Sequence, residues 1–247
     1  MDYSGNFSLQ PLHKITLPMD VSDPWNLKNL DTLDLSNNDL GPAAAAFLPA
    51  ALSGVSSLQV LSLGYNSFGD AGAVSLRDAL VNISSLRILD LRGNYIGKVG
   101  MKCLCPVVAN MLSLDTLDLG QNRIGDSGMS YLSAVLLRMS SLRKLKLAEN
   151  CIGDAGASSL SGVLMCTPGI TGLDVHGNFF SPHGVALLAI ALHKHCINYR
   201  LCEIWTLAAA VSMIRAPCLL AVHYRRCHRC DLSIWAKTIS TIAVSRP

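Results

Sequence analysis

Leucines recur along the chain in a fixed pattern whose unit is eleven residues long. The clearest copy runs from Leu86 to Ile96 and reads Leu-Arg-Ile-Leu-Asp-Leu-Arg-Gly-Asn-Tyr-Ile. Each copy starts 28 residues after the one before, and the other five begin at Leu30, Leu58, Leu114, Leu142 and Ile170. A fixed period of this length indicates a solenoid of stacked repeats.

The fourth and sixth positions of the unit are leucine in almost every copy. The fourth-position residues are Leu33, Leu61, Leu89, Leu117, Leu145 and Leu173, and the sixth-position residues are Leu35, Leu63, Leu91, Leu119, Leu147 and Val175. Positions two residues apart share one face of a strand. The pattern therefore predicts strands at Leu33–Leu35 and its equivalents, with this face pointing into the solenoid.

The second half of each repeat has the spacing of an amphipathic helix. Leu76 and Leu80 are four residues apart, and Ala73 lies one turn earlier. Candidate helix starts carry an N-capping aspartate or a proline, at Asp70, Asp126, Asp154, Pro42 and Pro182. A small residue two places further on predicts a close approach of the helix start to the preceding turn, at Ala44, Gly72, Gly100, Gly128, Gly156 and Gly184.

An asparagine occupies the ninth position of all six units. The six are Asn38, Asn66, Asn94, Asn122, Asn150 and Asn178. A polar side chain beside buried leucines needs hydrogen-bond partners. We therefore expect each amide to bond the turn backbone of its own repeat and of neighbouring repeats.

The pattern L-x-x-L-x-L-x-x-N-x-L resembles the leucine-rich repeat, and the 28-residue period is similar to that of the ribonuclease-inhibitor-like class, which includes NLR sensor regions. This resemblance implies an α/β horseshoe solenoid with parallel strands on the concave face and helices on the convex face. It divides the chain into an N-terminal flank or degenerate cap at residues 1–29, six repeats at residues 30–197 and an atypical C-terminal tail at residues 198–247.

Charge is distributed unevenly between the repeats and the tail. Residues 1–198 contain 13 Lys/Arg and 15 Asp/Glu, whereas residues 199–247 contain 7 and 2. The repeats therefore lack the basic stripe that follows a phosphate backbone, which argues against nucleic-acid binding.

The chain start and the cysteines indicate a reducing compartment. No basic segment followed by an apolar run marks a signal peptide at the start. The nine cysteines share no column of the repeat, which predicts free and mostly buried thiols and a cytoplasmic location.

The repeat pattern is lost after Cys196, and three interpretations of the tail stay open. One is a helical end cap followed by a disordered tail, or an anomalous translated terminus. Another is a membrane span at residues 204–222, which Arg215 near its middle disfavours. The third is a metal site, for which the lone C-x-x-C at Cys227 and Cys230, with His223 or His228, is weak support.

Outward strand positions on the concave face supply the candidate partner-binding residues. They are Asp34, Tyr65, Asp90, Arg92, Asp118, Gln121, Arg143, Lys144, Lys146, Asp174 and His176. Asp90 and Asp118 should stack as like charges on neighbouring strands, both pointing to solvent. A partner's Lys or Arg inserted there would relieve the repulsion. An acidic middle with a basic group at Arg143, Lys144 and Lys146 suits a protein surface.

The repeats contain no catalytic constellation and no nucleotide motif, so we expect neither a cofactor nor a metal. The function expected is a non-catalytic protein-interaction module, and more finely a regulatory or innate-immune-sensor-like scaffold. The alternative is a GTPase activator. Resemblance to Ran-GTPase-activating proteins implies a catalytic arginine in an N-terminal repeat loop and an acidic tail. Arg92 is the early candidate, but the tail here is basic.

Overall fold

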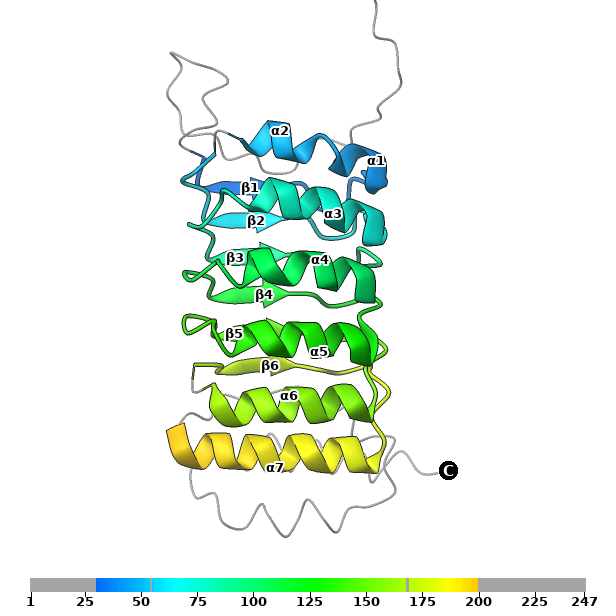
Figure 1. The fold of residues 1–247 in the computed structure, drawn as a ribbon, viewed down its shortest axis with the longest axis vertical. Coiled ribbons are helices and arrows are strands. Elements are labelled where there is room, and N and C mark those ends of the chain that lie inside the picture. Colours follow the sequence, from blue (N-terminus) through cyan, green and yellow to red (C-terminus); the bar gives the residue numbers. More distant parts are fainter. Residues whose placement is uncertain (1–29, 54, 168, 200–247) are drawn as a thin grey trace, which may run out of the picture.

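The computed structural model describes residues 30–53, 55–167 and 169–199. Within them, a parallel six-stranded sheet follows the chain order β1-β2-β3-β4-β5-β6, and helices stack beside it along the same axis (Figure 1). The expected N-terminal cap and all three interpretations of the tail lie outside these residues. In the described part, no helix combines the length and the apolar character needed to cross a membrane.

The strands are three residues long and the helices vary in length. The strands are β1 (Thr32–Asp34), β2 (Val60–Ser62), β3 (Ile88–Asp90), β4 (Thr116–Asp118), β5 (Lys144–Lys146) and β6 (Gly172–Asp174). The helices are α1 (Gly41–Ala45), α2 (Leu48–Leu52), α3 (Gly69–Leu80), α4 (Lys98–Val108), α5 (Gly125–Leu136), α6 (Asp154–Cys166) and α7 (Pro182–Tyr199).

Each strand begins and ends one residue earlier than the sequence pattern predicted. In four of the repeats an aspartate holds the fifth position and its carboxylate accepts the N–H two residues on, as Asp34 accepts the N–H of Ser36 at 2.9 Å. Such a local side-chain bond starts a turn in place of a longer strand. The sixth-position leucines still point inward, as expected.

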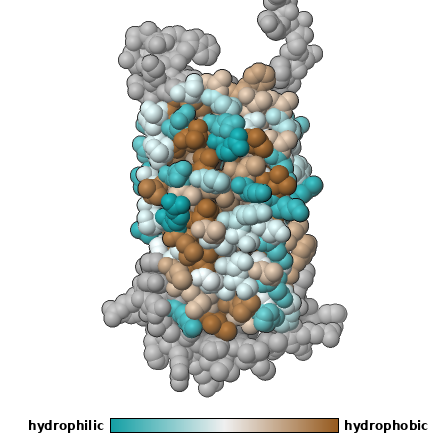
Figure 2. All heavy atoms as spheres, viewed as in Figure 1, coloured by the Kyte–Doolittle hydropathy of each residue, from teal (hydrophilic) through white to brown (hydrophobic). Residues whose placement is uncertain are grey.

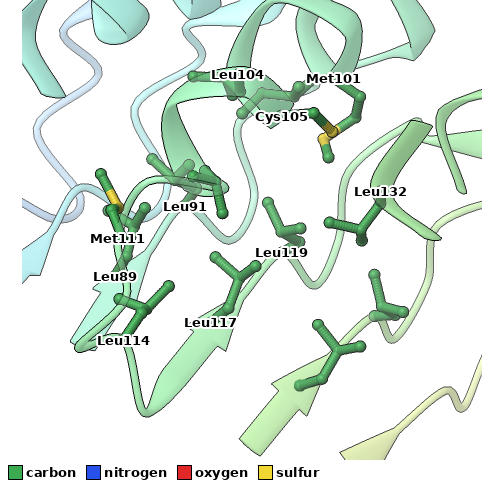
Figure 3. Packing of buried hydrophobic residues seen from close by; sticks show 14 of the residues in the cluster. Leu89, Leu91, Met101, Leu104, Cys105, Met111, Leu114, Leu117, Leu119 and Leu132 are labelled. Carbon is green, nitrogen blue, oxygen red and sulfur yellow. The ribbon is translucent and has the colours of Figure 1, made fainter. Parts of the chain in front are cut away.

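The core is continuous from the first repeat to the last. Leu89 and Leu91 of the third repeat are fully buried and belong to one cluster with Leu104 of α4, and Figure 3 shows these side chains between the strands and the helix. The predicted helix stripe is confirmed, because Ala73, Leu76 and Leu80 are all buried. Every strand thus sits on a leucine layer shared with its neighbours.

The first repeat departs from the expected single helix and contains two short ones, α1 and α2. Pro49 lies in the first turn of α2, where its missing N–H is tolerated. In a continuous helix the same proline would sit in the interior and remove a hydrogen bond. The chain therefore breaks at Ala46 and Phe47 and restarts.

The N-cap assignments of the aspartates are wrong, because each caps the helix of the following repeat. Asp70 Oδ1 accepts the N–H of Gly97 at 2.6 Å and of Gly100 at 2.8 Å, at the start of α4. Asp126 makes the same two bonds at the start of α6, with Gly153 and Gly156. A carboxylate at a helix N-terminus satisfies free N–H groups and opposes the helix dipole. These bonds therefore join neighbouring repeats.

Asp154 repeats this role at the start of α7. Its carboxylate accepts the N–H of Ser181 at 2.8 Å and also the Ser181 hydroxyl. These bonds hold the pKa of Asp154 below its ordinary value. In the third repeat Lys98 occupies the equivalent position, and Gly125 at the start of α5 takes a φ of 59° and donates its N–H to the carbonyl of Asn150 instead.

The expected close approach at the small-residue column is confirmed. A Cβ added to Gly72 would lie 2.7 Å from Cβ of Phe68, and one added to Gly128 would lie 2.7 Å from Cγ2 of Ile124. Larger side chains at these positions would push the helix start away from the turn before it.

The asparagine ladder is confirmed as well. Asn94 Nδ2 donates to the carbonyls of Leu91 in its own repeat (3.0 Å) and Leu63 in the preceding repeat (2.9 Å). Its Oδ1 accepts the N–H of Asn66 at 3.0 Å. Each asparagine therefore fixes the turn of one repeat against the next.

Candidate functional site

The outward positions of the strands form the open face of the sheet, which is the face expected to be concave. The strands are in register, so Asp90 pairs with Asp118 and Asp118 pairs with Lys146. The predicted stacking of two like charges is therefore present in the backbone register. The side chains of Asp90 and Asp118, however, have different partners.

Asp118 is buried, so the expectation that it points to solvent is wrong. Its side chain is only 7% exposed, and its Oδ2 lies 3.0 Å from Nζ of Lys146 on the next strand. Its Oδ1 accepts the N–H of Gly120 at 3.0 Å. The absence of a side chain at Gly120 lets the carboxylate fold against the backbone, where a Cβ would lie 3.2 Å from Oδ1. The charge of Asp118 is therefore balanced by Lys146, and its carboxylate stabilises the turn at Gly120.

Asp90 occupies the same position one repeat earlier without a cation. It is half-buried, and its Oδ1 accepts the N–H of Arg92 at 2.9 Å. Among the described residues no salt bridge reaches its carboxylate. Burial raises the pKa of Asp90 above its ordinary value, and the charge of Asp118 adds to this, while the hydrogen bond from Arg92 N–H and the charges of Lys146 and Arg92 offset part of the rise.

Apolar side chains lie beside Asp90 on the open face. Ile88, two residues earlier on β3, is 37% exposed, and its register partner on β2 is Val60. At the fifth position of the repeat, the register neighbours of Asp90 are Ser62 on β2 and Asp118 on β4. The surroundings of Asp90 therefore combine a carboxylate with exposed hydrocarbon.

A network of polar side chains runs across the ends of the strands. The hydroxyl of Tyr65 donates to Oε1 of Gln121 at 2.7 Å, and Nε of Arg92 donates to the same oxygen at 3.2 Å. Gln121 Nε2 donates to Glu149 at 3.0 Å. Tyr65, Gln121 and Glu149 all follow a strand in the left-handed backbone conformation, with φ between 51° and 56°. Four of the repeats are linked in this way.

Tyr65 reaches Gln121 two repeats away because Gly93 lies between them. A Cβ on Gly93 would lie 2.5 Å from a ring carbon of Tyr65, and the φ of Gly93 is 68°. The ring therefore occupies the space that any other residue at position 93 would fill.

His176 continues the network into the sixth repeat. Its Nδ1 lies 2.6 Å from Oδ1 of Asp174, and its Nε2 lies 3.6 Å from Oε1 of Glu149. The structure thus brings together five of the predicted site residues, Tyr65, Arg92, Gln121, Asp174 and His176, with Glu149 as the link.

The predicted basic group does not form one cluster. Lys146 is paired with Asp118, while Nη1 of Arg143 donates to the carbonyl of Gly169 at 3.2 Å before β5 begins. Lys144 is the first residue of β5, and its side chain is exposed. Asp34 lies apart in the first repeat, where it bonds the N–H of Ser36.

The sequence reasoning missed Tyr95 and Arg123. Each directly follows the ninth-position asparagine of its repeat and so lies in the turn, beyond the outward strand positions. The guanidinium carbon of Arg123 lies 4.7 Å from the ring centroid of Tyr95. Aromatic and arginine residues at one column in adjacent repeats were the available signal.

The described residues offer little for chemistry or metal binding. They contain no group of three His, Cys, Asp or Glu placed to hold a metal ion. Burial raises the pKa of the Cys105 thiol to about 12, which keeps it protonated and unreactive. The four cysteines that the structure describes, Cys103, Cys105, Cys151 and Cys166, are free thiols, as expected. Among these four, burial does not predominate, because Cys105 is buried whereas Cys151 and Cys166 are exposed.

Comparisons with known proteins agree with the architecture. A family model described as "Leucine Rich repeat" matches residues 26–48, 56–76, 82–105, 110–133 and 138–161. No curated protein matches the chain.

Two solved structures are similar to this chain to different degrees. Leiomodin-1 actin-binding site 2 is 13% identical over 63% of this chain and 89% of its own, with a TM-score of 0.51. The tropomodulin C-terminal domain from Caenorhabditis elegans is 15% identical over 70% and 89%, with a TM-score of 0.42. At such identities the first similarity shows a common fold and nothing about partners.

Proposed function

Because the chain is a leucine-rich repeat protein, we propose that it is a non-catalytic module that binds a protein partner on the open face of its sheet. In this proposal the carboxylate of Asp90 receives a Lys or Arg side chain of the partner. The observation that carries it is the unpaired state of Asp90 beside the paired Asp118.

The pair of Asp118 and Lys146 illustrates how this face holds a cation. The lysine reaches the carboxylate from the same position of the next repeat. Asp90 has Asp118 in that place, so burial and the charge of Asp118 raise its pKa, and the charges of Lys146 and Arg92, which form no salt bridge with it, offset this only in part. A basic side chain of a partner would supply the missing charge, and close charge pairs at interfaces are coupled by about 1.5–7 kcal/mol.

The neighbours of Asp90 suit the rest of such a side chain. Lysine and arginine lay their methylene stems on apolar surface while the charged end reaches a polar group. Ile88 and Val60 provide that surface. The partner is therefore expected to present a basic residue from a protrusion that fits a sheet face.

The proposal extends to a regulatory scaffold acting in the cytoplasm. The resemblance to the ribonuclease-inhibitor-like class supports the scaffold role, including a role in sensing of the NLR kind. Free thiols at Cys103, Cys105, Cys151 and Cys166 support a reducing compartment.

The alternative of a GTPase activator rests on Arg92. Its guanidinium lies 5.8 Å from the ring centroid of Tyr65, and its Nε bonds Gln121. Both contacts hold the side chain against the protein. We expect the purified chain to leave GTP hydrolysis by a Ran-like GTPase unchanged. A tenfold acceleration that Arg92→Ala abolishes would replace the binding proposal with the activator.

Parallel pull-downs test the proposed function. The full chain, Asp90→Asn and Asp78→Asn serve as immobilised baits, and quantitative mass spectrometry compares the retained proteins. Both substitutions remove one negative charge, but Asp78 is exposed on α3 beside Arg77. We expect a partner retained by the full chain and by Asp78→Asn, and depleted at least fivefold with Asp90→Asn. Equal retention on all three baits would place the binding surface elsewhere.

A further inference from the structure

Two tyrosine–arginine stacks link adjacent repeats in the segments that follow the strands. Arg92 of the third repeat lies over Tyr65 of the second, and Arg123 of the fourth lies over Tyr95 of the third. Tyr65 is 43% exposed and Tyr95 is 52% exposed. We call these four residues the strand-exit rim. Tyrosine and arginine are the residue types most enriched among the energetically dominant residues of protein interfaces.

The turns hold the two rings outward. Tyr65 and Tyr95 have φ values of 56° and 57°, a conformation that bulky residues rarely adopt. Asn122 pins the turn on both sides of Tyr95, because its Oδ1 accepts the N–H of Asn94 at 3.1 Å and of Ile96 at 2.9 Å. The rim is therefore ordered by the asparagine ladder before any partner binds, which reduces the entropy lost on binding.

The arginines of the rim keep donors available. No salt bridge joins Arg92 or Arg123 to a carboxylate within the described parts of the chain. The nearby carboxylates have other roles, since Asp70 bonds the start of α4 and Glu149 bonds Gln121. A guanidinium stacked on an aromatic face still presents its edge N–H groups to a carboxylate.

We propose that the strand-exit rim binds an acidic segment of a protein. Its carboxylates would pair with Arg92 and Arg123, while the rings of Tyr65 and Tyr95 cover its side-chain stems. The rim adjoins the cation site at Asp90, whose carboxylate accepts the N–H of Arg92, but it has the opposite charge preference. A nucleic-acid strand fits less well, because residues 1–198 contain 13 Lys/Arg against 15 Asp/Glu and so offer no basic stripe along which a long phosphate backbone could run.

Fluorescence anisotropy with the full chain at low salt tests the rim. The probe is a fluorescein-labelled eight-residue peptide of alternating glutamate and glycine. We expect saturable binding that Arg92→Gln with Arg123→Gln weakens at least tenfold. The matched control, Arg87→Gln with Arg138→Gln, removes the same charge from two exposed arginines outside the rim and should change affinity less than twofold.

A third variant separates the rim from net charge. Tyr95→Asn removes the ring without changing charge, and asparagine tolerates the left-handed turn. We expect it to weaken peptide binding about three- to tenfold, a range typical for loss of one interface aromatic. Circular dichroism would verify that each variant is folded.

Three results with the peptide probe would overturn the rim proposal. They are absence of saturable binding to the full chain, equal weakening by the two arginine pairs, or no effect of Tyr95→Asn. Tighter binding of a labelled uridine octamer that depends on the rim arginines would also overturn it, in favour of nucleic acid. Because the probe is anionic and no variant alters Asp90, failure here would leave the proposed function untouched.

Discussion

Asp90 and Asp118 are the same residue type at the same position of adjacent repeats, yet their surroundings differ. Asp118 lies beside Lys146 and is buried and paired, whereas Asp90 lies beside Asp118 and is half-buried and unpaired. The column of the repeat places both carboxylates on the open face. The residue at that column in the next repeat then decides whether a carboxylate stabilises the solenoid or stays available to a partner.

The comparison assumes that both aspartates stand on equivalent scaffolds. Leu91 and Leu119 hold the sixth position of the third and fourth repeats, and both are buried. Replacing either with alanine should cost about 2–5 kcal/mol, because a cavity opens between stacked repeats. Urea denaturation followed by circular dichroism measures the loss. A cost under about 0.5 kcal/mol for one of them would show that the two repeats are not equivalent.

Gly93 follows β3 and lies between Asp90 and Asp118 in the sequence, so its substitution tests the packing where the strands end. Gly93→Ala should destabilise the protein by about 2–3 kcal/mol, through the left-handed φ and the clash with Tyr65. Gly41→Ala is the control, since Gly41 has a φ of 66° but nothing within 4 Å of the added Cβ. Its cost should be only about 1–2 kcal/mol. Equal unfolding free energies for the two variants would mean that Tyr65 does not occupy the space over Gly93.

Charge removal should separate the two aspartates directly. Asp118→Asn loses the bond to Lys146 and should cost about 1 kcal/mol. Asp90→Asn keeps an acceptor for the Arg92 N–H and should change the unfolding free energy at pH 7 by less than about 0.5 kcal/mol. Urea denaturation followed by circular dichroism measures both unfolding free energies. A larger effect at Asp90 than at Asp118 would reverse the assignment of roles.

The smallest expected effect is the pH dependence at Asp90. Its pKa is raised in the folded state, so its contribution to stability is fully present below the unfolded value of 3.8 and is lost as pH rises through the folded pKa. Relative to Asp90→Asn, the full chain should therefore lose stability as pH rises from about 3 to 7. Unfolding free energies of both proteins across this range measure it. A difference that moves the opposite way would mean that a cation already pairs with Asp90.

The period of 28 residues was sufficient to predict the parallel stacking of the strands, the inward leucines and the register that places Asp90 beside Asp118. It could not predict the burial of Asp118, because that depends on where the long side chain of Lys146 ends. The helix caps were misassigned for a similar reason. A cap is normally sought within its own helix, while Asp70 and Asp126 reach the next one.

The site was predictable only in part. Alternation along the strands identified Tyr65, Arg92 and Gln121, whose side chains do meet. Tyr95 and Arg123 were missed because they lie in the turn, where strand alternation no longer tells which way a side chain points. The sequence also grouped Arg143, Lys144 and Lys146, which the fold assigns to different contacts.

A double-mutant cycle tests the central claim most directly. Once a partner is identified by the pull-downs, its affinity is measured for the full chain and Asp90→Asn, each with the native partner and with a basic interface residue of the partner changed to Gln. If that residue enters the site at Asp90, the coupling energy should be at least about 1.5 kcal/mol. Coupling within about 0.3 kcal/mol of zero for every basic residue of the partner's interface would contradict the account.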